Sequence, residues 1–402
     1  MLGHWPLAAT TPARFSYWHA IPPDAIPRLA DLPELEGDSH FGNGGSCYID
    51  GRCRMAWATD ERWISRHAKM KRILVTGALG QIGTELTTRL RDLYGTDNVL
   101  ATDVTPLPEQ NQSRWAPYEL LDVRDRSAIC RIIQQRQIDT IFHMAAILSA
   151  VGEQDPQRAW NVNINGLHNV LESARSHGVQ RIFCPSSIAV FGPNAPRSRT
   201  PQDTITHPKT MYGVTKVTGE LLGSYYVDHY GLDIRGIRYP GVISSEAPPG
   251  GGTTDYAVEI FYAAVRDRRY TCFVSAETAL PMIYMPDCIR AAIDLMCADA
   301  SRLIHRTDFN ISPMSFSAGQ LADEIRRHLP DFECTFEPDH RQAIADSWPR
   351  DLDDSAARNE WDWKPEFGLS EMTADMLDKL AARINREGCR GESANQDSRS
   401  TR

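Results

Sequence analysis

Short apolar runs and segments with helical spacing alternate along the chain from Met70 onward. Apolar runs predict strands, and segments whose apolar residues recur every three or four positions predict helices. The predicted strands cover residues 73–75, 98–101, 140–143 and 181–184, and the predicted helices cover 81–93, 125–135, 161–176 and a segment that begins near Met211. Because strands alternate with helices, we expect an α/β fold with a doubly wound, Rossmann-like parallel sheet.

The alternation loosens after about Tyr239. Helical spacing returns at residues 255–266, 317–328 and 370–384, with loops between them. We therefore predict a sheet domain over residues 70–240 and a smaller C-terminal lobe over 241–385, interleaved with the end of the sheet. Residues 386–402 are polar and are predicted to form a disordered tail.

Residues 1–69 differ from the rest because they are rich in Trp, His, Pro and Gly and show no sustained periodicity. A mitochondrial transit peptide would be rich in arginine and poor in acids. The first twenty residues contain only Arg14, and acidic residues follow from Asp24. We interpret residues 1–69 as a disordered or non-native extension, and a functional leader is the alternative.

Composition narrows the function class. The chain has 402 residues, of which 42% are hydrophobic, enough for the core of two or three lobes, and its formal net charge of −9 offers no basic field for nucleic acid. No run approaches the roughly 18 apolar residues of a membrane span.

Nine scattered cysteines without a Cys-x-x-Cys pattern fit free thiols in a reducing compartment, and their spacing matches no usual metal site. We expect a cytoplasmic protein without a metal, or a mitochondrial one if residues 1–69 are a leader.

A glycine-rich turn directly follows the first predicted strand. Gly77, Gly80 and Gly83 allow a tight turn and close approach of the backbone to a ligand, and Gln81 and Ile82 begin the next helix. A helix N-terminus offers free N–H groups to a pyrophosphate. Although the spacing is GxxGxxG, its place between strand and helix predicts a dinucleotide-binding turn rather than a packing turn.

Asp103 ends the second predicted strand, where a carboxylate can accept hydrogen bonds from both hydroxyls of the adenosine ribose. Because its charge would repel a 2′-phosphate, the sequence favours NAD over NADP and makes residues 70–240 the NAD-binding domain. Asp122 and Val123 close a third short strand and are positioned to contact the adenine. Asp122 as an ordinary residue at a helix entry remains open.

Three residues point to proton transfer at the same edge of the sheet. Tyr212 and Lys216 lie one helical turn apart, and an ammonium beside a phenol favours the phenolate, which is a general base. Ser187 ends a predicted strand and can hydrogen-bond a reacting oxygen. His143 is interpreted as a core histidine, and Asn163 as a residue that supports the neighbouring strand or a bound water.

Together, the glycine turn, Asp103, Asp122, residues 143–146, Ser187 and residues 212–216 resemble the extended short-chain dehydrogenase/reductase family, also described as NAD-dependent epimerases and dehydratases. The resemblance implies that Tyr212 is the general base. It also implies that Lys216 holds the nicotinamide ribose and tunes Tyr212, and that Ser187 positions the substrate oxygen. Ala145, Ala146 and Pro240 would line the cofactor with Tyr212 and Lys216. Family members generally pair through the helix that carries the tyrosine, so a homodimer is expected.

Three stretches, residues 238–244, 249–257 and 280–287, resemble the L-threonine 3-dehydrogenases of this family. This implies oxidation of the 3-hydroxyl of L-threonine to L-2-amino-3-oxobutyrate with reduction of NAD to NADH. Ser149 and Thr253 would then hold the amino acid together with Ser187 and Tyr212. The alternatives are a nucleotide-sugar epimerase or a related sugar-modifying enzyme, and an NAD-binding sensor without catalysis.

Overall fold

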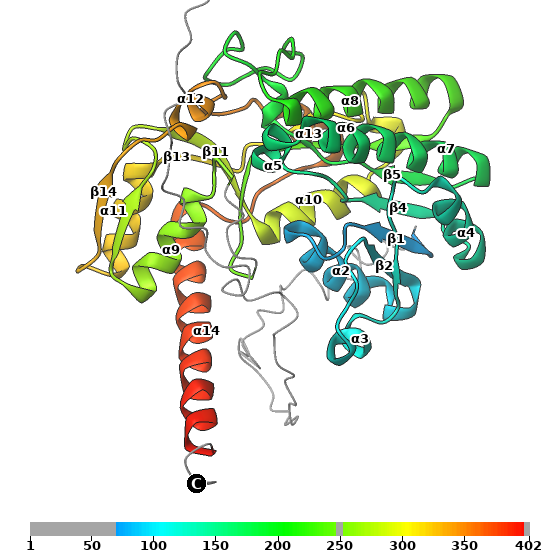
Figure 1. Ribbon diagram of the computed structural model, residues 1–402. Helices are drawn as coiled ribbons and strands as arrows, with labels where there is room; N and C mark the ends of the chain where they lie inside the picture. Colours follow the sequence, from blue (N-terminus) through cyan, green and yellow to red (C-terminus); the bar gives the residue numbers. More distant parts are fainter. Residues whose placement is uncertain (1–69, 247–251, 398–402) are drawn as a thin grey trace, which may run out of the picture. The chain divides into compact units, whose positions relative to one another are not determined.

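The computed structural model describes residues 70–246 and 252–397 (Figure 1). The predicted extension over residues 1–69 lies outside the described residues, as do 247–251 and 398–402. In the described part, no helix combines the length and the apolar character that a membrane crossing requires. Six of its cysteines, Cys130, Cys184, Cys272, Cys288, Cys297 and Cys334, are free thiols, as predicted.

A six-stranded parallel sheet with the order β3-β2-β1-β4-β5-β7 forms the centre of the fold. The chain starts in the middle, proceeds to one edge and then crosses to the other side, so a crevice opens between the carboxyl ends of β1 and β4. This confirms the predicted Rossmann-like α/β fold. The strands of this sheet are β1 (Ile73–Thr76), β2 (Val99–Asp103), β3 (Tyr118–Leu120), β4 (Thr140–His143), β5 (Arg181–Phe183) and β7 (Asp233–Arg235).

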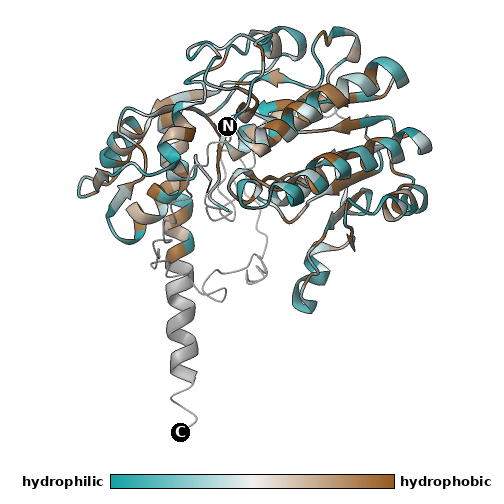
Figure 2. Ribbon diagram, turned by 45° about the horizontal axis from the view of Figure 1, so that its top comes forward, coloured by the Kyte–Doolittle hydropathy of each residue, from teal (hydrophilic) through white to brown (hydrophobic). Residues whose placement is uncertain are grey.

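Helices cover both faces of this sheet (Figure 1). On one face, α2 and α10 bury Leu86, Leu90 and Ile289, and on the other, α4 and α7 bury Ile129 and Leu171. The apolar sides of these elements face each other and the hydrophilic sides face outward (Figure 2). The helices of this part are α2 (Gln81–Tyr94), α3 (Glu109–Trp115), α4 (Arg126–Arg136), α5 (Ser149–Gln154), α6 (Pro156–Trp160), α7 (Leu167–His177), α8 (Met211–Tyr230) and α10 (Met285–Cys297).

Two three-stranded sheets connect the central sheet to the C-terminal lobe. In one, β6 and β12 flank β8, and in the other, β9 and β13 flank β11. Their strands are β6 (Ser186–Ser187), β8 (Ile237–Tyr239), β9 (Gly241–Ile243), β11 (Ala279–Tyr284), β12 (Phe309–Asn310) and β13 (Met314–Ser317).

The C-terminal lobe has its own core, which includes Tyr256, Phe261, Leu321 and Met376. A pair of parallel strands, β10 and β14, completes it. Its remaining elements are β10 (Arg269–Cys272), β14 (Glu333–Phe336), α9 (Tyr256–Arg266), α11 (Ala318–His328), α12 (Arg341–Asp346), α13 (Ser355–Trp361) and α14 (Leu369–Asp397). β9 and β11 also contact α10, which covers one face of the central sheet.

Three element boundaries differ from the sequence prediction. The helix predicted over 161–176 starts as a π-helical turn, η5 (Asn161–Gly166), before α7 begins. Asn163 explains this difference, because its side chain is turned inward to hydrogen-bond the backbone of Ile147. β3 ends two residues before Asp122. α14 continues to Asp397, beyond the point where a disordered tail was predicted.

Two glycines of α8 allow a matched test of how this helix is seated. A Cβ atom at Gly213 would lie 2.2 Å from the Ala189 carbonyl oxygen, whereas one at Gly219 would lie 3.4 Å from the Leu167 side chain. We expect Gly213→Ala to lower the free energy of unfolding by about 1–3 kcal/mol, because the helix must move outward. Gly219→Ala should leave it unchanged or raise it by up to about 1 kcal/mol, because alanine favours helix. Urea unfolding measures both, and equal effects would contradict the close seating of α8.

Candidate active site

The glycine turn lies between β1 and α2 at the crevice of the sheet. Gly77 has a φ of +65°, and a Cβ atom there would lie 2.6 Å from the backbone nitrogen of Ala145. A Cβ atom at Gly83 would lie 2.2 Å from the Gly77 carbonyl oxygen. Gly80 is the N-cap of α2 and carries no capping side chain, so Gln81 and Ile82 begin a helix whose first N–H groups can receive an anion. The turn therefore fits a pyrophosphate.

Asp103 lies at the end of β2 beside this turn. Its carboxylate accepts hydrogen bonds from the backbone nitrogens of Leu79 and Thr105, each at 3.1 Å. The Leu79 contact joins the acid directly to the glycine turn. The carboxylate is thus held at the same sheet edge as the pyrophosphate site, as the hypothesis of ribose recognition requires.

Asp122 and Val123 follow β3 at the next position along that edge. The carboxylate of Asp122 binds the Arg124 guanidinium, with both oxygens 3.0 Å from Nε. This hydrogen bond holds the pKa of Asp122 below its ordinary value. Val123 packs against Gly166, where a Cβ atom would lie 2.7 Å from Val123 Cγ2. An adenine ring at this position would therefore contact an aspartate that is already ion-paired.

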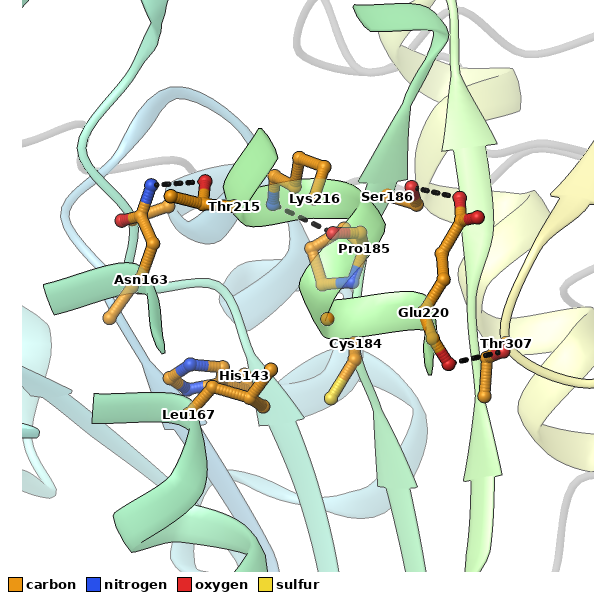
Figure 3. A pocket seen from close by; sticks show the side chains of 13 residues that line it. His143, Asn163, Leu167, Cys184, Pro185, Ser186, Thr215, Lys216, Glu220 and Thr307 are labelled. Atoms are coloured by element: carbon orange, nitrogen blue, oxygen red, sulfur yellow. Dashed lines mark hydrogen bonds between the residues drawn. The ribbon is translucent and has the colours of Figure 1, made fainter. Parts of the chain in front are cut away.

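The end of β4 closes the other side of the crevice. His143 is buried, and its Nδ1 lies 2.9 Å from Thr76 Oγ1 on β1. Burial and the nearby Lys216 lower the pKa of His143 to about 3, so its ring is neutral near pH 7. This confirms its interpretation as a core histidine. Ala145 and Ala146 follow it and line the pocket in Figure 3.

The chemical part of the site is formed by β6 and α8. Lys216 donates a hydrogen bond from Nζ to the Pro185 carbonyl oxygen at 2.7 Å (Figure 3). Its Nζ lies 5.4 Å from the centre of the Tyr212 ring. Ser187 comes two residues after Pro185, and its Oγ accepts a hydrogen bond from the Ala189 nitrogen. Thr210 caps α8 by accepting from the Gly213 nitrogen. The structure thus brings Ser187, Tyr212 and Lys216 to one edge of the sheet.

Asn163 supports this arrangement from η5. Its amide exchanges hydrogen bonds with both backbone groups of Ile147, at 2.7 and 3.0 Å, and its Nδ2 donates to Thr215 Oγ1 at 3.1 Å (Figure 3). Thr215 lies next to Lys216 on α8. Asn163 therefore joins the loop after β4 to the tyrosine helix, which agrees with the structural role expected from sequence.

A buried polar network next to Ser187 was not predicted from the sequence. Ser186 Oγ donates a hydrogen bond to Glu220 at 2.5 Å, and Glu220 forms a bidentate ion pair with Arg238 at 2.8 and 2.9 Å. Burial raises the pKa of Glu220, while Arg238 and Ser186 act against the shift. A sequence signal existed, because Glu220 lies one turn beyond Lys216 on the same side of α8.

The remaining predicted site residues come from three other elements. Pro240 is buried between β8 and β9. Ser149 is the first residue of α5, which packs against α8, and Thr253 is buried just before α9. The structure therefore places Ser149 near the tyrosine helix and Thr253 at the edge of the C-terminal lobe. Among residues 70–246 and 252–397, no group of three or more His, Cys, Asp or Glu residues could hold a metal ion.

Comparison with known proteins agrees with this geometry. A protein of Staphylococcus haemolyticus, described only as an uncharacterized epimerase/dehydratase, is 50% identical to this chain over 309 residues. The alignment covers 77% of this chain and 97% of that protein. An L-threonine dehydrogenase structure from Clostridium difficile has a TM-score of 0.76 at 50% identity and covers 78% of this chain and 98% of its own. The holo form of an L-threonine dehydrogenase from Cupriavidus necator has a TM-score of 0.75 at 49% identity, with 77% and 99% covered.

A UDP-glucose 4-epimerase from Thermotoga maritima is more distant, with a TM-score of 0.68 and 25% identity over 78% of this chain and 99% of its own. Residues 73–312 match the model of the NAD dependent epimerase/dehydratase family, and this confirms the family predicted from sequence. The chain therefore belongs to the NAD dependent epimerase/dehydratase family.

Proposed function

We propose that this protein is an NAD-dependent L-threonine 3-dehydrogenase that oxidises the 3-hydroxyl of L-threonine to L-2-amino-3-oxobutyrate. The main support for this proposal is the hydrogen bond from Lys216 Nζ to the Pro185 carbonyl oxygen, two residues before Ser187. Tyr212 lies one helical turn before Lys216 on α8. The choice of substrate is supported by about 50% identity to two L-threonine dehydrogenases over nearly their whole length.

In this proposal Tyr212, Lys216 and Ser187 have separate roles in the oxidation. Tyr212 accepts the proton of the substrate hydroxyl, and the Lys216 ammonium lies over its ring, 5.4 Å from the ring centre. Ser187 orients the hydroxyl oxygen from the end of β6. NAD, when bound, supplies the acceptor for the hydride that leaves the carbon bearing this hydroxyl. The oxygen thus loses a proton and its carbon loses a hydride, so the secondary alcohol becomes a ketone.

The cofactor side is assigned to residues around the crevice. In this proposal the N-terminus of α2, with Gly77, Gly80, Gln81, Ile82 and Gly83, holds the pyrophosphate. The ribose and adenine contact Asp103, Asp122 and Val123, while Ala145, Ala146 and Pro240 lie along the rest of the cofactor. Ser149 and Thr253 hold the amino acid.

A nucleotide-sugar epimerase is the second candidate, because relatives are described as uncharacterized epimerase/dehydratases and a UDP-glucose 4-epimerase shares the fold. An epimerase returns the hydride to its product and yields no net NADH. The two candidates therefore differ in a directly measurable product.

The first prediction is that the purified chain forms NADH from NAD and L-threonine. Absorbance at the NADH band measures the rate, with D-threonine, L-allo-threonine, L-serine and 3-hydroxybutyrate as alternative substrates. No NADH from any of them, with NAD still bound, would reject the dehydrogenase proposal. Epimerisation of a nucleotide sugar would then support the second candidate.

The second prediction concerns the general base. Tyr212→Phe should lower turnover by at least about 10²-fold, because proton transfer from the hydroxyl loses its acceptor. NAD binding, measured by calorimetry, should persist. The matched control is Tyr230→Phe, which changes an exposed tyrosine at the far end of the same helix and should leave turnover unchanged. Normal turnover in Tyr212→Phe would remove Tyr212 from the mechanism.

The third prediction concerns cofactor choice. Asp103→Asn keeps an oxygen that can accept from Leu79 but removes the charge that repels a 2′-phosphate. We expect NADP affinity to rise about tenfold, which corresponds to about 1.4 kcal/mol. Titration of protein fluorescence with NAD and NADP measures this change. Asp97→Asn, at an exposed acid before β2, is the control, and an unchanged NADP affinity in Asp103→Asn would contradict the ribose role.

We also propose that the enzyme is a homodimer that pairs through α8. Val214, Leu221 and Tyr225 lie along one side of this helix, and their side chains are 39%, 68% and 46% exposed. Val151 and Trp160, on the neighbouring α5 and α6, are exposed as well. Contiguous exposed apolar residues of this kind mark interaction surfaces.

The fourth prediction tests this pairing. Leu221→Glu should produce a monomer by analytical ultracentrifugation, because a charge would be buried between two apolar helices. Ile205→Glu is the control, since Ile205 is 88% exposed on a loop that is not part of this helix, and it should leave the mass unchanged. A wild-type chain that sediments as a monomer would contradict the dimer.

A further inference from the structure

Glu85 is a half-buried carboxyl group on the helix that is assigned to the pyrophosphate. It lies four residues after Gln81 in α2, which corresponds to about 6 Å along the helix axis. Its Oε1 accepts a hydrogen bond of 2.8 Å from Ser244 Oγ, just beyond the end of β9. Ser244 is buried, and its Oγ also accepts from the Glu246 nitrogen at 3.0 Å. A chain of hydrogen bonds therefore runs from the cofactor helix to the end of β9.

Charged and titratable groups surround Glu85 on every neighbouring element. On its own helix, Arg89 pairs with Asp92, and beyond β9 the carboxylate of Glu246 faces Glu85. On α14, the Lys379 ammonium binds Asp375 at 2.8 Å, and Arg383 donates to the Glu246 carbonyl oxygen at 3.0 Å. Tyr284 on β11 and Cys288 on α10 complete the surroundings.

These surroundings favour the neutral acid. Burial raises the pKa of Glu85 to about 7, and the negative charge of Glu246 acts in the same direction. The Ser244 hydrogen bond and the Lys379 ammonium act against this shift. Lys379 is already paired with Asp375, so its charge compensates Glu85 only in part. Glu85 therefore changes protonation near neutral pH.

We propose that Glu85 is a positioning residue that takes up a proton when the dinucleotide binds at the N-terminus of α2, and that it couples cofactor binding to the end of β9. The inference rests on the NAD site of the proposed function but not on the substrate. The proton comes from solvent, and no other bond forms or breaks.

The direction of the coupling follows from charge. A bound pyrophosphate adds negative charge one helical turn from Glu85, and a like charge favours the protonated acid. NAD therefore binds the protonated protein more tightly. Well below pH 7 Glu85 is already protonated in the free protein, so the NAD affinity is constant there. The NAD affinity falls as the pH rises from the pKa of Glu85 in the free protein to its pKa in the complex. Above both pKa values the affinity is constant again.

The neutral acid also preserves the contact to β9. A protonated Glu85 still accepts from Ser244 through its carbonyl oxygen, and it places no negative charge between the pyrophosphate and Glu246. Ser244 keeps the Glu246 backbone in place, and Arg383 holds the same residue from α14. Cofactor binding at α2 is thereby transmitted to the strand end that precedes Thr253 in the sequence.

Calorimetry of NAD binding to the full chain tests this proposal. At each pH the titration is repeated in buffers of different ionisation enthalpy, so that the slope gives the protons taken up. We expect uptake of about half a proton per NAD near pH 7.5, and an NAD affinity about tenfold weaker at pH 9 than at pH 6. In Glu85→Gln both effects should disappear, because the amide does not titrate.

Two further variants separate titration from structure. Glu259→Gln alters another half-buried carboxyl, which accepts from Tyr270 on the C-terminal lobe, and it should keep the uptake of the wild type. Ser244→Ala removes a hydrogen bond that lowers the pKa of Glu85, so its uptake should move to higher pH. A purely structural contact would produce no such displacement. If Glu85→Gln does not fold, the displacement in Ser244→Ala remains a test.

Wild-type proton uptake in Glu85→Gln would overturn the inference, as would an uptake in Ser244→Ala that stays at the wild-type pH. These results are independent of the substrate. NAD binding with the expected uptake, but no oxidation of L-threonine, would reject only the proposed substrate and leave the role of Glu85 in place.

Discussion

The candidate site depends on the close approach of two backbones at Gly77. A side chain there would collide with the backbone of Ala145, and the positive φ favours glycine at the same position. The approach brings the start of α2 and the end of β4 to one crevice, and the hydrogen bond between Thr76 and His143 holds the two strands together directly below it. Without this contact the anion-binding helix terminus and the strand end that carries Ala145 could not line one ligand.

Much of this arrangement could be predicted from the sequence because its signals are local. The apolar runs that form β1, β2, β4 and β5 are flanked by turns, and their alternation with helices implies the parallel sheet. The glycine turn, Asp103 and the Tyr212–Lys216 pair are each recognised within a few residues. Their meeting at one edge follows from the rule that parallel strands present their carboxyl ends together.

Contacts between distant segments could not be predicted in the same way. Glu85 and Ser244 are 159 residues apart, and Glu220 and Arg238 lie 18 residues apart on a helix and a strand, so neither pair leaves a periodic signal. The π-helical turn at Asn161–Gly166 was also missed, because it depends on the inward hydrogen bonds of Asn163 rather than on the spacing of apolar residues. The partners that compensate these buried charges could therefore not be predicted from the sequence.

The Glu220–Arg238 pair has a consequence for the order in which the site can form. Arg238 also binds Asn310, and a chain that has been synthesised only through β7 contains the whole glycine turn but lacks both of these partners. A buried carboxylate without its partner is strongly destabilising, so α8 cannot settle while Glu220 is alone. During synthesis on the ribosome the cofactor half of the crevice can therefore fold early. The half that carries Tyr212 gains this buried ion pair only after Arg238 has been synthesised, and the hydrogen bond from Arg238 to Asn310 forms later still.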